Sequence, residues 1–306
     1  KQFIIPLGNL AQAQLIPHIK LIAVESLGEF YRCATSGSYG EINTKDGLIS
    51  EVADTSSEEQ GDFSDVIGQH QAKRALEIAA AGQHNVLLSG PPGTGKSMLA
   101  KALPSILPQL TREEMLIVTH LHSLARHQYE QIVSLRPFRS PHHSASDVAV
   151  IGGGQNPRPG EVSLAHGGVL FLDELPEFNR STIETLRQPL EDKVITISRA
   201  KDTLTFPADF ILIATKNPCP CGYYGTDKEC ICAPHAVMQY EKKLSGPILD
   251  RIDLYVDVDS VDHASLLALK TTEESSETIA QRVAVARSHQ LERDANHSKL
   301  NGTLGN

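Results

Sequence analysis

The chain has 306 residues, of which 40% are hydrophobic and 21% charged; this is typical of a soluble globular protein of about two domains that needs no disulfide or metal to fold. No apolar run approaches the ~18 residues of a transmembrane helix and the first residues lack a signal-peptide pattern, so we expect a cytoplasmic protein without a membrane partner. The formal net charge of −9 comes mostly from an excess of Asp and Glu in residues 41–65, so it does not exclude a basic surface elsewhere.

The first part of the chain predicts a domain end and a linker. Residues 1–40 alternate short apolar runs with Gly and Pro, which is typical of the end of an α/β domain. Residues 41–62 are acidic and poor in large apolar side chains, which indicates a linker. Because the chain starts without Met and ends in a polar stretch, we expect a piece of a longer protein.

The remaining elements predict a parallel sheet covered by helices. Helices are expected at 69–81, where Gly82 ends the pattern, at 98–103, which Pro104 stops, and over 264–295. Strands are expected at 85–89, 169–172 and 210–214. The apolar residues of these strands are continuous rather than alternating, which is expected when helices cover both faces of a parallel sheet.

A phosphate-binding loop follows the first of these strands. Residues 90–97 fit the pattern G-x-x-x-x-G-K-[ST] in full, between a strand and a helix as its mechanism requires. Backbone N–H groups of such a loop surround phosphates, Lys96 would neutralise phosphate oxygens, and Ser97 would hold Mg²⁺. The predicted nucleotide-binding residues are Gly90, Pro91, Pro92, Gly93, Thr94, Gly95, Lys96, Ser97, Met98 and Asp173.

Two acids follow the second strand. Asp173 and Glu174 would lie at the carboxyl end of a parallel strand, where ligands of α/β sheets bind. Asp173 would bind Mg²⁺ and Glu174 would polarise the attacking water. The alternative is an ordinary helix start, where acids are favoured, but a complete phosphate loop upstream favours the catalytic interpretation.

Asn217 follows the third strand. Its amide could contact the γ-phosphate or the attacking water. The alternative is an Asn turn before Pro218.

Four cysteines gather in a short segment, as two C-x-C pairs: Cys219, Cys221, Cys230 and Cys232. Four soft ligands fit a tetrahedral structural Zn²⁺. The alternatives are buried free thiols and redox chemistry. Cys33 stands apart and is expected to be a small buried apolar residue.

The motifs resemble those of a known family. The phosphate loop, the Asp-Glu strand and the Asn strand occur in the order found in AAA+ ATPases. More specific strings, RPFRSPHH at 136–143, PRPGE at 157–161 and NPCPCG at 217–222, resemble the magnesium-chelatase-like ATPases of the YifB/ComM type. The similarity covers roughly residues 1–300.

The resemblance implies an architecture. It implies an α/β fold with a P-loop AAA+ three-layer core, a parallel sheet with helices on both faces. Residues 1–40 would be the remnant of a Lon-protease-like domain, 41–62 a linker, 63–262 the ATPase core and 263–306 the start of a truncated helical lid. It further implies a homohexameric ring in which Arg251 is an arginine finger that reaches a neighbour's site. The alternative for Arg251 is a local ion pair with Asp250 or Asp253.

The resemblance also implies a function. We expect an ATP- and Mg²⁺-dependent motor, a helicase or branch-migration factor that acts on single-stranded or branched DNA in natural transformation. The alternatives are a magnesium-chelatase-type motor that remodels a protein partner and an ATP-gated binding module. Two insertions, 134–166 and the hairpin-like 194–206, could face the pore of the ring. Their bases Arg139, Arg158, Arg199 and Lys201 would contact DNA phosphates or, at least as well, be ordinary solvated or subunit-interface charges.

Overall fold

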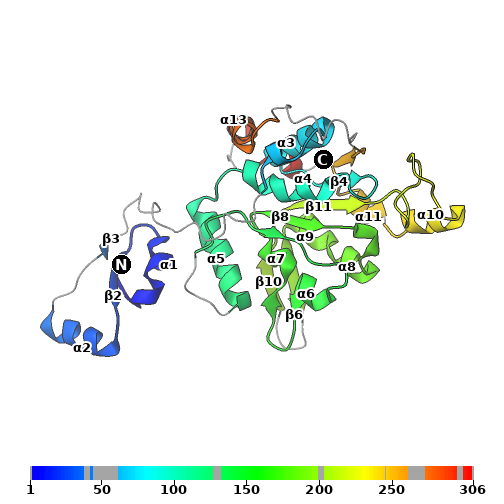
Figure 1. Ribbon diagram of the computed structural model, residues 1–306. Coiled ribbons are helices and arrows are strands. Elements are labelled where there is room, and N and C mark those ends of the chain that lie inside the picture. The colour runs from blue at the N-terminus through cyan, green and yellow to red at the C-terminus, as the bar shows by residue number, and fades with distance from the viewer. Residues whose placement is uncertain are drawn as a thin grey trace. The chain divides into compact units, whose positions relative to one another are not determined.

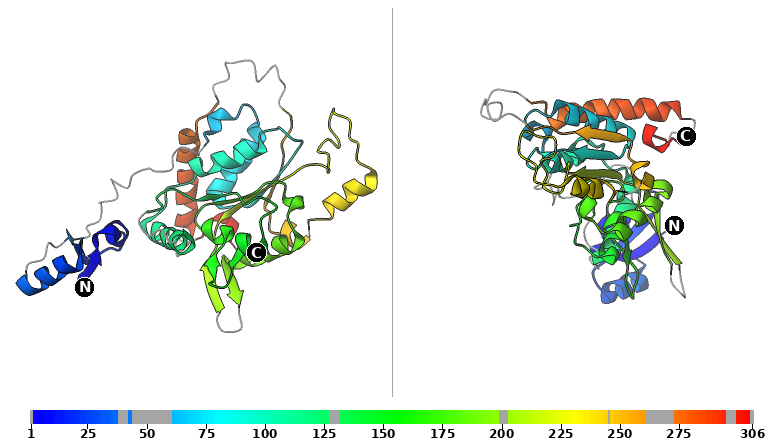
Figure 2. Two further views of the ribbon diagram at one scale, coloured as in Figure 1. Left: turned by 60° about the horizontal axis from the view of Figure 1, so that its bottom comes forward. Right: turned by 90° about the vertical axis from the view of Figure 1, so that its right-hand side faces the viewer.

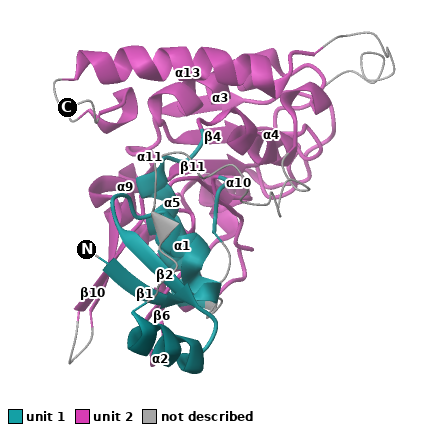
Figure 3. Ribbon diagram, turned by 90° about the vertical axis from the view of Figure 1, so that its left-hand side faces the viewer, with its two compact units in different colours: residues 1–57, 109–135 teal, residues 58–108, 136–306 magenta. Residues whose placement is uncertain are grey.

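The computed structural model describes residues 2–37, 42–43, 61–126, 132–198, 203–244, 246–260, 273–294 and 299–304. None of the helices in these ranges combines the length and the apolar character needed to cross a membrane. The chain divides into two compact units, shown in different colours in Figure 3. Unit 1 comprises Lys1–Ser57 and Gln109–Leu135, and unit 2 comprises Glu58–Pro108 and Arg136–Asn306.

Unit 1 contains a small sheet flanked by helices. Strand β1 (Gln2–Pro6) pairs in parallel with β2 (Lys20–Val24), and β3 (Ile42–Asn43) pairs antiparallel with β2. The helical elements in the part of this unit that the structure describes are η1 (Leu7–Asn9), α1 (Leu10–Gln14), α2 (Leu27–Ser36) and α5 (Arg112–Arg126). The two apolar runs of residues 1–40 thus form β1 and β2, which are paired with each other and joined by helical turns.

Local caps explain the limits of α2. The Ser26 side chain accepts a hydrogen bond from the Glu29 N–H at 3.2 Å, which satisfies a free donor of the first turn. Gly37 follows the last residue with φ +67°, a left-handed conformation that ends helices and favours glycine.

Unit 2 is built on a five-stranded parallel sheet in the order β12-β4-β11-β8-β5. The strands are β4 (Val86–Ser89), β5 (Phe138–Arg139), β8 (Val169–Leu172), β11 (Ile211–Lys216) and β12 (Leu254–Asp257). The three predicted strands are β4, β8 and β11, and β11 lies between the other two.

Helices cover both faces of this sheet, as Figure 1 shows. In its described residues, the α-helices of unit 2 are α3 (His70–Gly82), α4 (Lys96–Ala102), α6 (Asp147–Ile151), α7 (Glu161–Leu164), α8 (Arg180–Thr185), α9 (Arg187–Asp192), α10 (Pro234–Glu241), α11 (Gly246–Leu249) and α13 (Ser276–Arg293). Short 3-10 helices occur at η3 (Phe63–Asp65), η4 (Leu103–Ile106), η5 (Leu175–Glu177) and η6 (Asn301–Thr303).

The side chains of successive strand residues pack into two different hydrophobic cores, one on each face of the sheet. Leu88 and Phe171 lie on one face of the sheet, with side chains of α3, α4 and α13. Leu87 and Leu170 lie on the other face, with side chains of α7, α8 and α9. Both faces are therefore buried, which is why the apolar residues of the strands are continuous rather than alternating. The predicted fold class, a three-layer α/β core around a parallel sheet, is confirmed.

Both predicted insertions contain a hairpin. Strands β6 (Gly152–Gly153) and β7 (Arg158–Pro159) form a short one, and β9 (Val194–Ser198) and β10 (Thr203–Pro207) form a longer one. Figure 2 shows the longer hairpin projecting from the rest of unit 2. Arg199 and Lys201 lie outside the described residues.

Of the helix predicted over 264–295, the described residues form α13 (Ser276–Arg293), and residues 273–275 precede its start without being helical. Ile279 and Val283 are buried in the core that also contains side chains of α3. Residues 264–272 of that predicted helix, which include the apolar Leu266, Leu267 and Leu269, lie outside the described residues.

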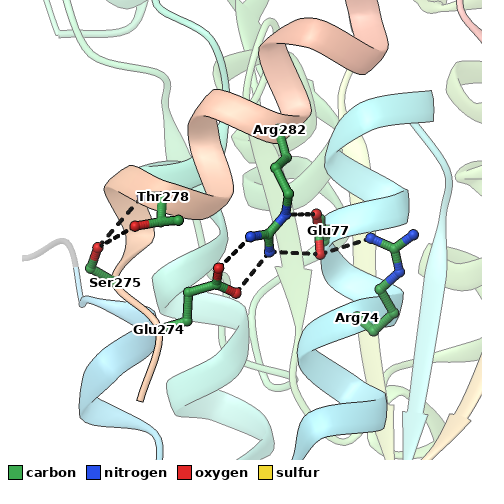
Figure 4. A network of polar contacts seen from close by, with 6 residues as sticks. All are labelled: Arg74, Glu77, Glu274, Ser275, Thr278 and Arg282. Atoms are coloured by element: carbon green, nitrogen blue, oxygen red, sulfur yellow. Dashed lines mark hydrogen bonds and ion pairs between the residues drawn. The ribbon is translucent and has the colours of Figure 1, made fainter. Parts of the chain in front are cut away.

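Charged groups also join α13 to α3 (Figure 4). The Arg282 Nε donates to Glu77 Oε1 at 2.7 Å, and Arg282 Nη2 donates to Glu274 Oε2 at 2.7 Å. Arg74 forms a second ion pair with Glu77, at 3.0 Å. Burial raises the pKa of Glu77, but the hydrogen bonds from the two arginines outweigh it and hold this pKa below its ordinary value.

Candidate functional site

The phosphate loop connects β4 to α4, as the motif requires. Gly93 and Gly95 have φ angles of +80° and +88°, which few residues other than glycine adopt. Position 90 needs glycine for a different reason, the lack of room for a side chain, because a Cβ atom there would lie 2.2 Å from the carbonyl oxygen of Val258. The Gly90 N–H donates to Lys216 O at 3.2 Å, which joins the loop to the end of β11.

Side-chain hydrogen bonds also hold this loop, including two from Gln69, which the sequence patterns did not single out. Gln69 Nε2 donates to Thr94 O at 3.2 Å and to Asp259 O at 2.6 Å. Thr94 Oγ1 donates to Pro91 O at 3.1 Å within the loop. Met98, on the first turn of α4, is 51% exposed. The loop is therefore fixed from both ends, with Met98 open to solvent beside it.

Lys96 is buried within the loop, with 8% of its surface exposed. Its Nζ donates to the carbonyl oxygens of Gly90 and Pro91, both at 2.7 Å. Burial lowers the pKa of Lys96, and the charges of Asp173 and Glu174 partly oppose that shift. The ammonium group is thus held between the loop and the two acids.

Asp173 connects three elements. It directly follows β8, and its Oδ2 accepts a hydrogen bond from Ser97 Oγ of α4 at 3.2 Å. Its Oδ1 accepts a shorter bond, 2.6 Å, from Thr215 Oγ1 of β11. Ser97 and Asp173, the two predicted Mg²⁺ ligands, are therefore brought together. Both offer the hard oxygen ligands that Mg²⁺ prefers, so the residues present fit that ion.

Glu174 and Asn217 also lie together. Glu174 adopts φ +53°, and its N–H donates to Thr215 Oγ1 at 2.8 Å. Asn217 Nδ2 donates to Glu174 Oε1 at 3.2 Å, and the Asn217 N–H lies 3.4 Å from Tyr240 Oη on α10. Asn217 is thus in contact with the predicted catalytic acid, which a simple turn before Pro218 would not require.

Thr215 and Tyr240 were not predicted. Thr215 is only 1% exposed and joins both acids, yet in the sequence it is one polar residue at the end of an apolar strand. Tyr240 is buried on α10, and burial raises its pKa to about 12, so its hydroxyl stays neutral. The available signal for Thr215 was its place at a strand end, beside the predicted Asn217.

Arg251 is not part of this cluster. Asn85 Nδ2 donates to Arg251 O at 2.9 Å, and Asn85 directly precedes β4, so Arg251 lies at the amino end of the sheet. The phosphate loop leaves β4 at the opposite end. The Arg251 side chain forms an ion pair with Glu191 of α9 and donates to Pro247 O at 2.5 Å. Its ion-pair partner is thus Glu191 rather than Asp250 or Asp253, the partners named in the alternative to the arginine finger.

The four cysteines converge. Their sulfur atoms all lie within 4.8 Å of one another. The backbone N–H of Tyr223 lowers the pKa of Cys221 to about 6. The N–H of Cys232 acts in the same sense on Cys230, but burial and neighbouring thiols outweigh it and raise the pKa of Cys230 to about 12. Negative charges this close repel one another, so a single thiolate is favoured over several. A bound cation reverses this preference because it stabilises all of the thiolates.

The insertion arginines have different surroundings. Both Arg139 nitrogens that face Glu161 donate to its carboxylate, Nε at 2.5 Å and Nη2 at 2.6 Å. Arg158, on β7, is exposed. Arg139 therefore has a protein partner, whereas Arg158 faces solvent.

Comparison with known proteins gives consistent matches. The family model described as "Magnesium chelatase, subunit ChlI" matches residues 62–266. The uncharacterized protein YifB of Escherichia coli strain K12 is 49% identical over 250 residues, which are 80% of this chain and 48% of YifB. The competence protein ComM of Haemophilus influenzae is 49% identical over 238 residues, 76% of this chain and 46% of ComM. The chain thus spans about half the length of the curated relatives it matches.

A solved structure also matches. It describes the complex between subunits BchI and BchD of magnesium chelatase from a cryo-EM reconstruction. The match covers 78% of each chain with 21% identity and a TM-score of 0.49.

Proposed function

Because the chain belongs to the magnesium chelatase ChlI family, as its motifs predict, we propose that it binds and hydrolyses ATP as a subunit of a ring-forming motor that acts on DNA. The observation that carries this proposal is the convergence of Lys96, the Ser97–Asp173 pair and the Glu174–Asn217 pair at one edge of the sheet. In this proposal residues 63–262 form the ATPase core and residues 263–306 begin a helical lid.

Each residue has a defined part in the reaction. Lys96 and the loop N–H groups bind the β- and γ-phosphates, and Ser97 and Asp173 would hold Mg²⁺, which neutralises charge on the phosphate oxygens. Glu174 accepts a proton from the attacking water. Asn217, held beside Glu174, orients that carboxylate and the water.

Arg251 completes the site of a neighbouring subunit. Its position at the amino end of β4 keeps it away from the phosphate loop of its own chain, which supports a role between subunits. An arginine that stabilises the transition state in this way accelerates hydrolysis by about 10³–10⁵. In the proposed homohexamer Arg251 would leave Glu191 for the neighbour's γ-phosphate.

The proposal extends to DNA and to zinc. The competence name of ComM supports a DNA substrate, so we infer helicase or branch-migration activity on single-stranded or branched DNA. Exposed Arg158 and the projecting hairpin β9–β10 are the proposed contacts. In this proposal the four cysteines hold a Zn²⁺ ion, since four converging thiols are the soft ligands that zinc prefers. The ion is structural rather than catalytic, because four protein ligands leave no open coordination position.

Substitution of Glu174 tests the ATPase assignment. Glu174→Gln should keep the Kd for ATP and lower the rate of phosphate release by about 10²–10⁴, the size of a general-base contribution. The matched control is Glu177→Gln, because Glu177 lies nearby on η5 and its carboxylate contacts Lys243 at 3.1 Å instead of the site. Wild-type turnover in Glu174→Gln, or no ATP binding by the wild-type chain, would overturn the assignment.

A DNA titration separates the candidate functions. A DNA motor should hydrolyse ATP faster with single-stranded or branched DNA, with an effect that falls steeply as salt rises. A chelatase-type motor, which the family description favours, should show no response to any DNA. An ATP-gated binding module should instead bind DNA fully with ATP in the Glu174→Gln variant.

A further inference from the structure

The segment 219–232, called the cysteine knuckle below, connects the ATP site to α10. It begins two residues after Asn217 and ends just before α10 (Pro234–Glu241). Nothing in the ATP chemistry described above uses these cysteines. Their place between two elements of the ATP site nevertheless calls for a physical role.

The sulfur geometry fits a zinc ion. Cys219 Sγ lies 3.3 Å from Cys221 Sγ and 3.7 Å from Cys230 Sγ, and the latter two are 3.6 Å apart. A tetrahedral Zn²⁺ with bonds of about 2.3 Å separates its sulfur ligands by about 3.8 Å. An S–S bond is only about 2.0 Å long, so these distances match metal ligands rather than disulfides.

Backbone groups prepare this geometry. The Gly222 N–H donates to Cys219 O at 2.9 Å and closes a tight turn, in which Gly222 has φ +87°. The Tyr224 N–H donates to Cys219 Sγ at 3.3 Å. N–H groups aimed at sulfur stabilise the thiolate form that binds metal, so the turn is built around the ligands.

The cysteine knuckle also contacts the phosphate loop. A Cβ atom on Gly222 would lie 2.6 Å from Cδ and 2.7 Å from Cγ of Pro92, so the Gly222 backbone lies directly against the proline ring. Cys219, at the start of the knuckle, is completely buried. One side of the knuckle is thereby fixed against the loop that contains Lys96.

The other side of the knuckle returns to Asn217. Tyr240, on the helix that follows the knuckle, is 4% exposed, and its hydroxyl is within reach of the Asn217 N–H. The chain therefore leaves Asn217, passes through the four cysteines and comes back to Asn217 through α10. This loop of chain, from Asn217 to Tyr240, can close only if the two C-x-C pairs stay together.

We infer that a Zn²⁺ ion bound by Cys219, Cys221, Cys230 and Cys232 clamps this loop of chain in its closed form and thereby positions Asn217 for ATP hydrolysis. The inference rests on the proposed ATPase function. The cysteines are positioning residues, since their effect on the reaction passes through Asn217. Loss of the ion releases Asn217 from Glu174, whereas Lys96 stays held by β4 and α4.

The first measurement is zinc content and turnover. Wild-type protein purified under reducing conditions should contain about one zinc per chain by mass spectrometry of the metal. Cys232→Ser should lose the zinc and about tenfold in kcat, the loss expected when one catalytic contact is misplaced, with a smaller change in the Kd for ATP. Cys33→Ser, on α2 and outside the knuckle, is the matched control and should change neither.

A double-mutant cycle distinguishes positioning from general damage. In an Asn217→Ala background, Cys232→Ser should cause little further loss of kcat, because the group that the clamp positions is already absent. Cys232→His, which keeps four ligands, should retain the zinc and the wild-type rate. If Cys232→Ser does not fold, removal of zinc from native protein with a chelator, followed by re-addition, gives the same comparison, with circular dichroism as the check on folding.

Different results would reject different claims. Zinc-free wild-type protein from a fresh reducing preparation, a folded zinc-free variant with the wild-type kcat, or multiplicative losses in the double mutant would each overturn the clamp. Absence of ATP hydrolysis in zinc-loaded wild-type protein would instead overturn the proposed function.

Discussion

Replacing Thr215 with Val tests how the two acids are positioned. Thr215 Oγ1 donates to Asp173 Oδ1 at 2.6 Å and accepts the Glu174 N–H at 2.8 Å. Valine has nearly the same shape, and the site is buried, so the substitution removes both hydrogen bonds and changes the packing little.

The magnitude follows from these two bonds. A hydrogen bond to a charged group contributes about 1.5–3 kcal/mol, and the Glu174 N–H would also lose its partner. If that free energy appears in the transition state, kcat falls by about 10- to 150-fold, at ~1.4 kcal/mol for each factor of ten. The Kd for ATP should change much less, because the contacts of Lys96 do not involve Thr215.

Steady-state ATPase assays and calorimetric ATP titration measure the two quantities. Thr215→Ser retains the hydroxyl and should recover most of the rate. Thr205→Val, on an exposed position of β10, is the matched control for the same chemical change. A Thr215→Val enzyme with wild-type kcat, in a folded protein, would show that the hydroxyl does not position the acids.

Three further substitutions test the supporting structure. Gly90→Ala places a Cβ 2.2 Å from Val258 O, so the Kd for ATP should rise by about tenfold or more in calorimetry; an unchanged Kd would contradict the close approach. Leu88→Ala, at a completely buried position, should lower the free energy of unfolding in urea by ~2–5 kcal/mol, and a negligible change would contradict its place in the core. Glu77→Gln should cost about 1 kcal/mol at pH 7, since Arg282 is half-exposed. Because folding lowers the pKa of Glu77 from 4.5, its contribution is present above that pH and lost as pH falls through the folded-state value, so the cost should disappear in acid; a pH-independent cost would refute the ion pair.

The central strands and the phosphate loop could be predicted because local signals determine them. Strands β4 and β8 are continuous apolar runs, and the glycines of the loop are needed for its own backbone angles. The order of the strands depends on packing between distant segments, and no local pattern encodes the position of β11 between the other two.

The unpredicted parts of the site depend on such distant neighbours. Thr215 reads as an ordinary strand residue until β8 brings Asp173 beside it. The sequence around Arg251 offers a neighbouring subunit or the nearby aspartates as partners, whereas in the folded chain α9 supplies Glu191. The cysteine spacing predicted a metal site, but only the turn at Gly222 shows how the sulfur atoms converge.

The position of β11 also sets the width of the candidate site. Because β11 separates β4 from β8, the phosphate loop and Asp173 start from strands two spacings apart, roughly 10 Å. Ser97 and Thr215 close that distance with their side chains. The backbone hydrogen bonds between strands therefore fix the distance between the phosphate loop and Asp173. Side-chain substitutions alter the chemistry within this span, whereas only a different strand order would alter its length.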